Sequence, residues 1–85
     1  MFNFRDHYNK LEELIGNCYQ SYKDNFNDQE RADIEEYLYK QGEYELAFDE
    51  FIAVLEWHKI VMDEKYVRKL DEAKRLMRTK PTTIS

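Results

Sequence analysis

The sequence contains few of the residues that turn or stop a chain, with two glycines and one proline among 85 residues. A β-sandwich or barrel needs a turn about every 8–12 residues, and such turns draw on glycine, proline or Asn-Gly pairs. Their scarcity excludes an all-β fold and favours helices. The short length also excludes a multidomain enzyme.

Cysteine and long apolar runs are equally scarce. Cys18 is the only cysteine, so neither an internal disulfide nor a cluster of thiolate metal ligands can form within this chain. No run approaches the roughly 18 apolar residues of a membrane span, and the N-terminal residues lack the apolar core of a secretory signal. We therefore expect a cytoplasmic protein without membrane contact.

Aromatic residues are plentiful although the mean hydropathy is low, at −0.90. The chain has seven tyrosines, five phenylalanines and one tryptophan, whereas disordered chains are poor in such residues. We expect a single folded domain over residues 1–80, followed by a flexible C-terminal tail over residues 81–85.

The spacing of apolar residues predicts an all-α bundle of four helices. In the first helix they recur every three or four residues, which places them on one face and leaves Gly16 on the polar side. Asn27 and Glu30 have the spacing of a capping box, and Gly42 suits a helix end. Asp63 suits the start of the last helix. The expected helices cover residues 4–24, 28–41, 43–58 and 63–79.

The third predicted helix is apolar on two sides. One stripe comprises Tyr44, Phe48, Phe51 and Leu55. The other, on the nearly opposite side, comprises Leu46, Ala53 and Trp57. A helix of this kind is normally central. We therefore expect another helix to cover the second stripe, and an interface with a partner is the alternative.

Charge is distributed unevenly around the net value of −5. Residues 27–58 hold ten acidic and two basic residues, whereas residues 59–85 hold eight basic and four acidic ones. The acidic segment suggests a basic partner and excludes direct nucleic-acid binding through that region. A simple solvated surface is the alternative explanation.

No recognisable constellation of catalytic or metal-binding residues occurs in the sequence. His7 and His58 are isolated, and Trp57-His58-Lys59 lacks the spacing of a metal-binding helix. Two separate glycines cannot form a phosphate-binding loop. We therefore expect neither enzymatic activity nor a cofactor or metal.

Residues 37–57 contain a local similarity to a known helical repeat. The stretch from Tyr39 to Phe51 resembles the turn and second helix of a tetratricopeptide repeat, with Gly42 in the turn and Ala47 at the helix crossing. A shift of about 34 residues reveals no second copy. The resemblance implies a helix pair, and an adaptor for a peptide or protein is one functional possibility.

A longer resemblance covers residues 35–77. Its members are Leu38, the run from Gly42 to Ala47, Phe51, Leu55, the run from Ile60 to Glu64, Leu70 and Met77. They resemble the small helical immunity proteins of the MafI type, including contact-dependent growth inhibition immunity proteins (CdiI). These bacterial proteins bind the C-terminal domain of a toxin, often a nuclease, and block its active site. The third helix departs from the Leu-rich family pattern through Phe48, Phe51 and Trp57.

Charge and resemblance together predict an immunity protein that occludes a basic nuclease toxin domain, as a monomer or in a 1:1 complex. A rigid acidic surface competes well for the basic cleft of a nuclease. The alternatives are the tetratricopeptide-like adaptor and a small regulator that uses helix 63–79 on nucleic acid. The expected partner-binding residues are Glu35, Glu36, Tyr39, Glu43, Glu45, Asp49, Glu50, Glu56 and Trp57.

Overall fold

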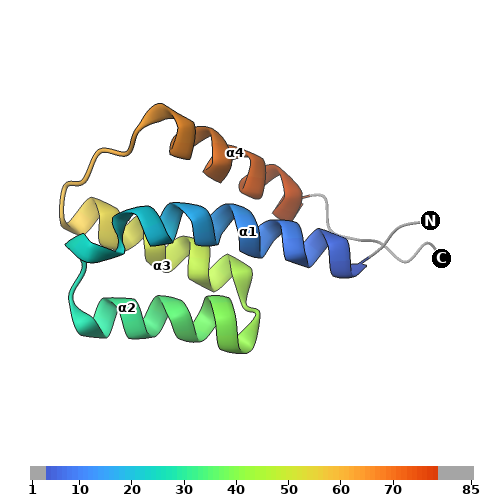
Figure 1. Cartoon of the computed structure of the whole chain (residues 1–85), viewed down its shortest axis with the longest axis horizontal. Coiled ribbons are helices and arrows are strands. Elements are labelled where there is room, and N and C mark those ends of the chain that lie inside the picture. Colours follow the sequence, from blue (N-terminus) through green and yellow to red (C-terminus); the bar gives the residue numbers. More distant parts are fainter. Residues whose placement is uncertain (1–3, 79–85) are drawn as a thin grey trace.

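The computed structural model describes residues 4–78, which form four α-helices and no strand (Figure 1). A 3₁₀ turn, η1, follows α1, and a π-helical turn, η2, continues α2. The predicted all-α bundle is confirmed. The expected tail, and the last residue of the predicted helix 63–79, lie outside the described range. The elements are α1 (Phe4–Tyr22), η1 (Lys23–Asn25), α2 (Asp28–Glu35), η2 (Glu36–Gln41), α3 (Tyr44–Trp57) and α4 (Glu64–Arg78).

The central helix is α1, and the expectation that the third helix is central was wrong. α4 packs along α1, while α3 and η2 contact it elsewhere, and α2 pairs with α3 (Figure 1). The reason is the width of the apolar face of α1, which allows the helix to serve several neighbours at once. Its buried apolar residues are Leu11, Leu14, Ile15, Cys18 and Tyr19.

Where the end of α1 meets the beginning of α4, polar groups as well as packing hold the two helices together. The hydroxyl of Tyr22 accepts a hydrogen bond from the backbone N–H of Asp63 at 2.8 Å. The rings of Tyr22 and Tyr66 meet edge to face, with centroids 5.4 Å apart. The Cys18 thiol contacts the carbonyl oxygen of Tyr66 at 3.5 Å. These contacts hold the beginning of α4 against the end of α1.

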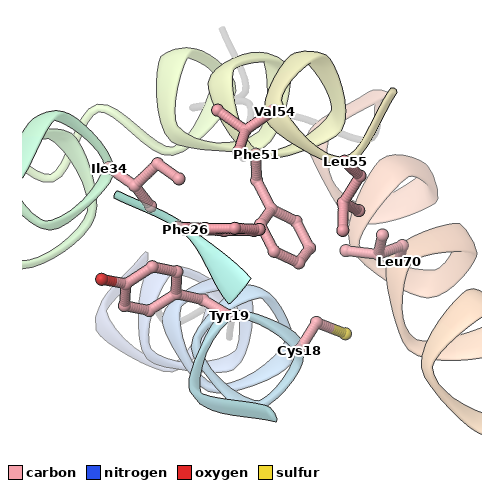
Figure 2. Close-up of a cluster of buried hydrophobic side chains, with 8 residues drawn as sticks. All are labelled: Cys18, Tyr19, Phe26, Ile34, Phe51, Val54, Leu55 and Leu70. Carbon is pink, nitrogen blue, oxygen red and sulfur yellow. The ribbon is translucent and has the colours of Figure 1, made fainter. Parts of the chain in front are cut away.

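Every helix contributes to the core, which forms two adjoining clusters. In the first, drawn in Figure 2, Phe51 of α3 lies between Phe26 and the α4 side chain of Leu70. This burial confirms that the Phe51 and Leu55 stripe belongs to the core. The first cluster comprises Cys18, Tyr19, Phe26, Ile34, Phe51, Val54, Leu55 and Leu70. The second comprises Leu11, Leu14, Ile15, Leu38, Ala47 and Ala73.

The predicted ends of α2 and η2 are confirmed in detail. The Asn27 side chain accepts from the backbone N–H of Glu30, and the Glu30 carboxylate accepts from that of Asn27, both at 2.8 Å. This reciprocal pair is a capping box. At the other end Gly42 has a φ of 65°, in the left-handed region that glycine adopts at low cost. Glu43 N–H then donates to the carbonyl of Tyr37 at 2.8 Å.

The end of α3 uses the same left-handed geometry without a glycine. Lys59 has a φ of 57°, and the N–H of Ile60 reaches back to the carbonyl of Leu55 at 2.9 Å. This is the hydrogen bond of a Schellman motif, in which glycine is the usual residue at the position of Lys59. Beyond it, Ile60 and Met62 are half-buried and Val61 is exposed, so alternate side chains of this connection face the core.

Gly16 corrects a second expectation, because it is buried and does not lie on a polar side. A Cβ atom built there would lie 3.1 Å from the hydroxyl oxygen of Tyr39. The same hydroxyl accepts a hydrogen bond from Gln20 at 3.2 Å. The missing side chain thus leaves room for the Tyr39 hydroxyl against α1, a tertiary contact that helical periodicity alone does not reveal.

Candidate interaction surface

One face of α3 points away from the core and is left uncovered by the described residues. We call it the α3 outer face; it comprises Leu46, Asp49, Glu50, Ala53, Glu56 and Trp57. Trp57 is 79% exposed and Leu46 is 47% exposed. The expectation that another helix covers the stripe of Leu46, Ala53 and Trp57 was therefore wrong. The physical reason is that α4 packs mainly against α1 and leaves this side of α3 open.

The α3 outer face has a simple geometry. Leu46, Ala53 and Trp57 are separated by seven and four residues, so they form one row along the helix. The row is about 16 Å long at the helical rise of 1.5 Å per residue. The smallest side chain stands between the two large ones, and Asp49 and Glu56 border the row. The surface is an apolar row with an acidic edge.

The electrostatics of α3 are one-sided. Its 14 residues carry four carboxylates and no lysine or arginine. Glu45 lies in the first turn, where it complements the positive end of the helix dipole. Glu56 lies in the last turn, where a negative charge is unfavourable for the helix. The stability of the helix therefore does not account for Glu56.

The structure places three of the expected partner-binding residues elsewhere. Glu35 is half-buried and accepts a hydrogen bond from the Tyr19 hydroxyl at 2.5 Å. Burial, together with this hydrogen bond, raises the pKa of Tyr19. Glu36 lies 3.8 Å from the ammonium of Lys40, and the hydroxyl of Tyr39 faces α1. These three side chains lie on α2 and η2 and are engaged within the molecule.

Glu43 and Glu45 lie at the other end of α3 from Trp57 and line a cleft of about 340 Å³. The cleft lies where α1, the α2–α3 turn and the end of α4 meet. Tyr8 of α1 also lines it, although it falls on the same helical repeat as the buried Leu11, Ile15 and Cys18. Helical spacing gives no sign that this ring stays 43% exposed. The lining residues are His7, Tyr8, Leu11, Gly42, Glu43, Tyr44, Glu45 and Met77.

The basic residues of α4 lie partly opposite the acidic edge of α3. A shallow groove is lined by Glu45, Phe48 and Asp49 from α3 and by Lys74, Met77 and Arg78 from α4. Elsewhere on α4, Arg68 pairs with Glu64 at 2.8 Å, four residues earlier on the same helix. Asp49 therefore shares this groove with two basic residues of α4, whereas Glu56 is not among the described residues that line it.

Cys18 and His58 both make contacts within the fold. Cys18 is buried, and desolvation raises the pKa of its thiol to about 11, which keeps the thiol protonated. The Nε2 atom of His58 lies 2.8 Å from a Glu30 oxygen, and its ring stacks on Phe26. Within residues 4–78, no group of His, Cys, Asp and Glu side chains could hold a metal ion.

None of the helices described here combines the length and apolar character that crossing a membrane requires. Comparisons with protein-family models, with curated proteins and with solved structures found no match. The functional assignment therefore depends on the surface itself and on the sequence resemblance.

Proposed function

We propose that this protein is a bacterial immunity protein that acts in the cytoplasm by binding the basic, nuclease-type C-terminal domain of a toxin and occluding its active site. The toxin belongs to a contact-dependent inhibition or polymorphic toxin system in this proposal. The observation that carries it is the α3 outer face, where an exposed Trp57 stands beside Glu56 on a helix without basic residues.

The apolar row would supply the binding energy. Exposed large apolar side chains that gather on one surface mark interaction sites, and tryptophan is enriched among the residues that dominate interface energies. Trp57 is almost fully available for burial by a partner. Leu46 extends the contact about three turns along the helix, and Ala53 leaves room for a partner side chain between them.

The acidic edge would supply partner selection. A nuclease must present a basic cleft to the phosphates of its substrate, so an acidic helix can compete for that cleft without any chemistry of its own. Opposite potentials also accelerate diffusional encounter. This division of roles predicts that Trp57 affects dissociation and the carboxylates affect association.

The test is co-purification with the basic C-terminal toxin domain encoded beside this protein's gene, followed by binding kinetics. Trp57→Ala should raise the dissociation rate at least about 30-fold, as expected for an anchor residue. The matched control is Val61→Ala, since Val61 is 91% exposed but lies outside α3. Equal dissociation rates for both variants would remove the α3 outer face from the interface.

A second candidate function is an adaptor that docks a neutral peptide helix. It is favoured by the α2–α3 hairpin, in which Ala47 is fully buried and Gly42 makes the left-handed turn, as in a tetratricopeptide repeat. A neutral partner would bind with little dependence on salt, whereas a basic toxin domain would bind more weakly as ionic strength rises. Salt dependence of the association rate therefore separates the two functions.

A further inference from the structure

A second concave site lies at the end of the molecule opposite to Trp57. The beginning of α1, the turn before α3 and the last turn of α4 lie together at this end (Figure 1). The cleft they form has a volume of about 340 Å³, which is at the small end of the range of about 300–1,000 Å³ typical of ligand sites. Its size suits one side chain or a small ligand.

Two tyrosines line this cleft from different helices. The rings of Tyr8 and Tyr44 stack with centroids 5.9 Å apart and planes 20° from parallel. His7 meets Tyr8 edge to face at 5.2 Å. Aromatic faces carry negative potential and bind cations that approach within about 6 Å of the ring centroid. The stacked pair thus offers a surface for a cation.

Carboxylates strengthen the negative potential around the tyrosines. Glu43 and Glu45 line the same cleft, and no lysine or arginine occurs among its described lining residues. Glu12 also acts on the pair, because its charge adds to burial in raising the pKa of Tyr44. Glu45 already interacts within the chain, so Glu43 is the carboxylate on which cation binding depends here.

We propose that this cleft binds a cationic side chain, the guanidinium of an arginine presented by the protein partner. A guanidinium is planar, so it can stack on the tyrosine rings while its N–H groups donate to a carboxylate. An ammonium offers only a point charge and would bind less well. The identity of the partner rests on the proposed function, whereas the preference of the cleft for the cation does not.

The test is an NMR titration of the whole protein with N-acetyl-arginine amide, with N-acetyl-glutamine amide as the neutral probe. The ring resonances of Tyr8 and Tyr44 should move and saturate only with the arginine probe. Glu43→Gln and Tyr8→Leu should each weaken binding about fivefold. Glu56→Gln is the matched control, because it makes the same change in charge on the opposite end of α3 and should alter the affinity less than about twofold.

Three outcomes would overturn the proposal. Equal shifts with the glutamine probe, or none with arginine, would show that the cleft does not recognise the cation. Equal weakening by Glu43→Gln and Glu56→Gln would assign the effect to overall charge. Simultaneous binding of the arginine probe and the toxin domain would exclude the partner as the source of the side chain. None of these results tests the role of Trp57. The proposed function is therefore tested independently, by the Trp57→Ala binding experiment.

Discussion

Gly16 of α1 lies against the hydroxyl of Tyr39 in η2. Alanine in a helix is about 1 kcal/mol more favourable than glycine, but a Cβ atom here would crowd that hydroxyl. We expect Gly16→Ala to stabilise the protein by about 1 kcal/mol in a Tyr39→Phe background and by less in the parent. Urea unfolding of the four proteins measures the difference, and equal stabilisation in both backgrounds would contradict the role given to the hydroxyl.

At Lys59, a left-handed backbone is occupied by a residue with a side chain. Such a conformation costs a non-glycine residue about 1–2 kcal/mol. Glycine avoids this strain, but its more flexible unfolded chain loses more conformational entropy on folding, which offsets part of the gain. Lys59→Gly should therefore raise the free energy of unfolding by about 0.5–1 kcal/mol. Lys59→Ala removes the same charge without freeing the backbone, so a comparable gain in that variant would point to electrostatics instead.

Within the elements, α3 divides sharply into a buried and an exposed side. Phe51→Ala and Leu55→Ala should each lower the free energy of unfolding by about 2–5 kcal/mol, because both side chains are buried in the first cluster. Leu46→Ala truncates a side chain on the α3 outer face and should change the stability by about 0.5 kcal/mol or less. Thermal or urea unfolding distinguishes them, and a large loss at Leu46 would mean that the outer face is covered within the molecule.

Glu30 links the start of α2 to the end of α3. Its hydrogen bond from the Asn27 backbone, and secondarily its bond to His58, hold the pKa of its carboxyl below the ordinary value of 4.5. A depressed folded-state pKa adds stability above the unfolded pKa, and this stability is lost as pH falls through the folded value. Glu30→Gln should therefore flatten the loss of stability below pH 4.5, measured by urea unfolding across pH. Glu56→Gln is the control variant. If Glu30→Gln lost stability below pH 4.5 as steeply as the parent does, the role given to the Glu30 carboxyl would be contradicted.

Helix bounds and caps were predictable from the sequence because periodicity and capping chemistry are local. Asn27 and Gly42 mark their positions by residue type alone. The sequence did not reveal which helix is central, since a stripe such as Leu46, Ala53 and Trp57 looks the same whether a neighbouring helix or a partner covers it. Gly16 was misplaced for a related reason, because close approach by η2 depends on the tertiary fold.

For the whole molecule, the separation of charge along the chain becomes a separation in space. Acidic residues concentrate on the α2–α3 hairpin, and basic residues concentrate on α4. Members of both sets line one groove, with Glu45 and Asp49 from α3 and Lys74 and Arg78 from α4. Away from that groove, Glu56 and Trp57 present negative charge and apolar area together. Negative charge and exposed apolar area thus coincide on one side of the molecule.

The central claim is that the α3 outer face competes with nucleic acid for the active site of a basic toxin domain. The most direct measurement is fluorescence anisotropy of labelled nucleic acid bound to a catalytically inactive form of that domain. The parent protein should displace the nucleic acid, and Trp57→Ala should require at least about 30-fold more protein to do so. Tight binding of the parent to the domain without displacement, or equal displacement by Trp57→Ala, would contradict the account.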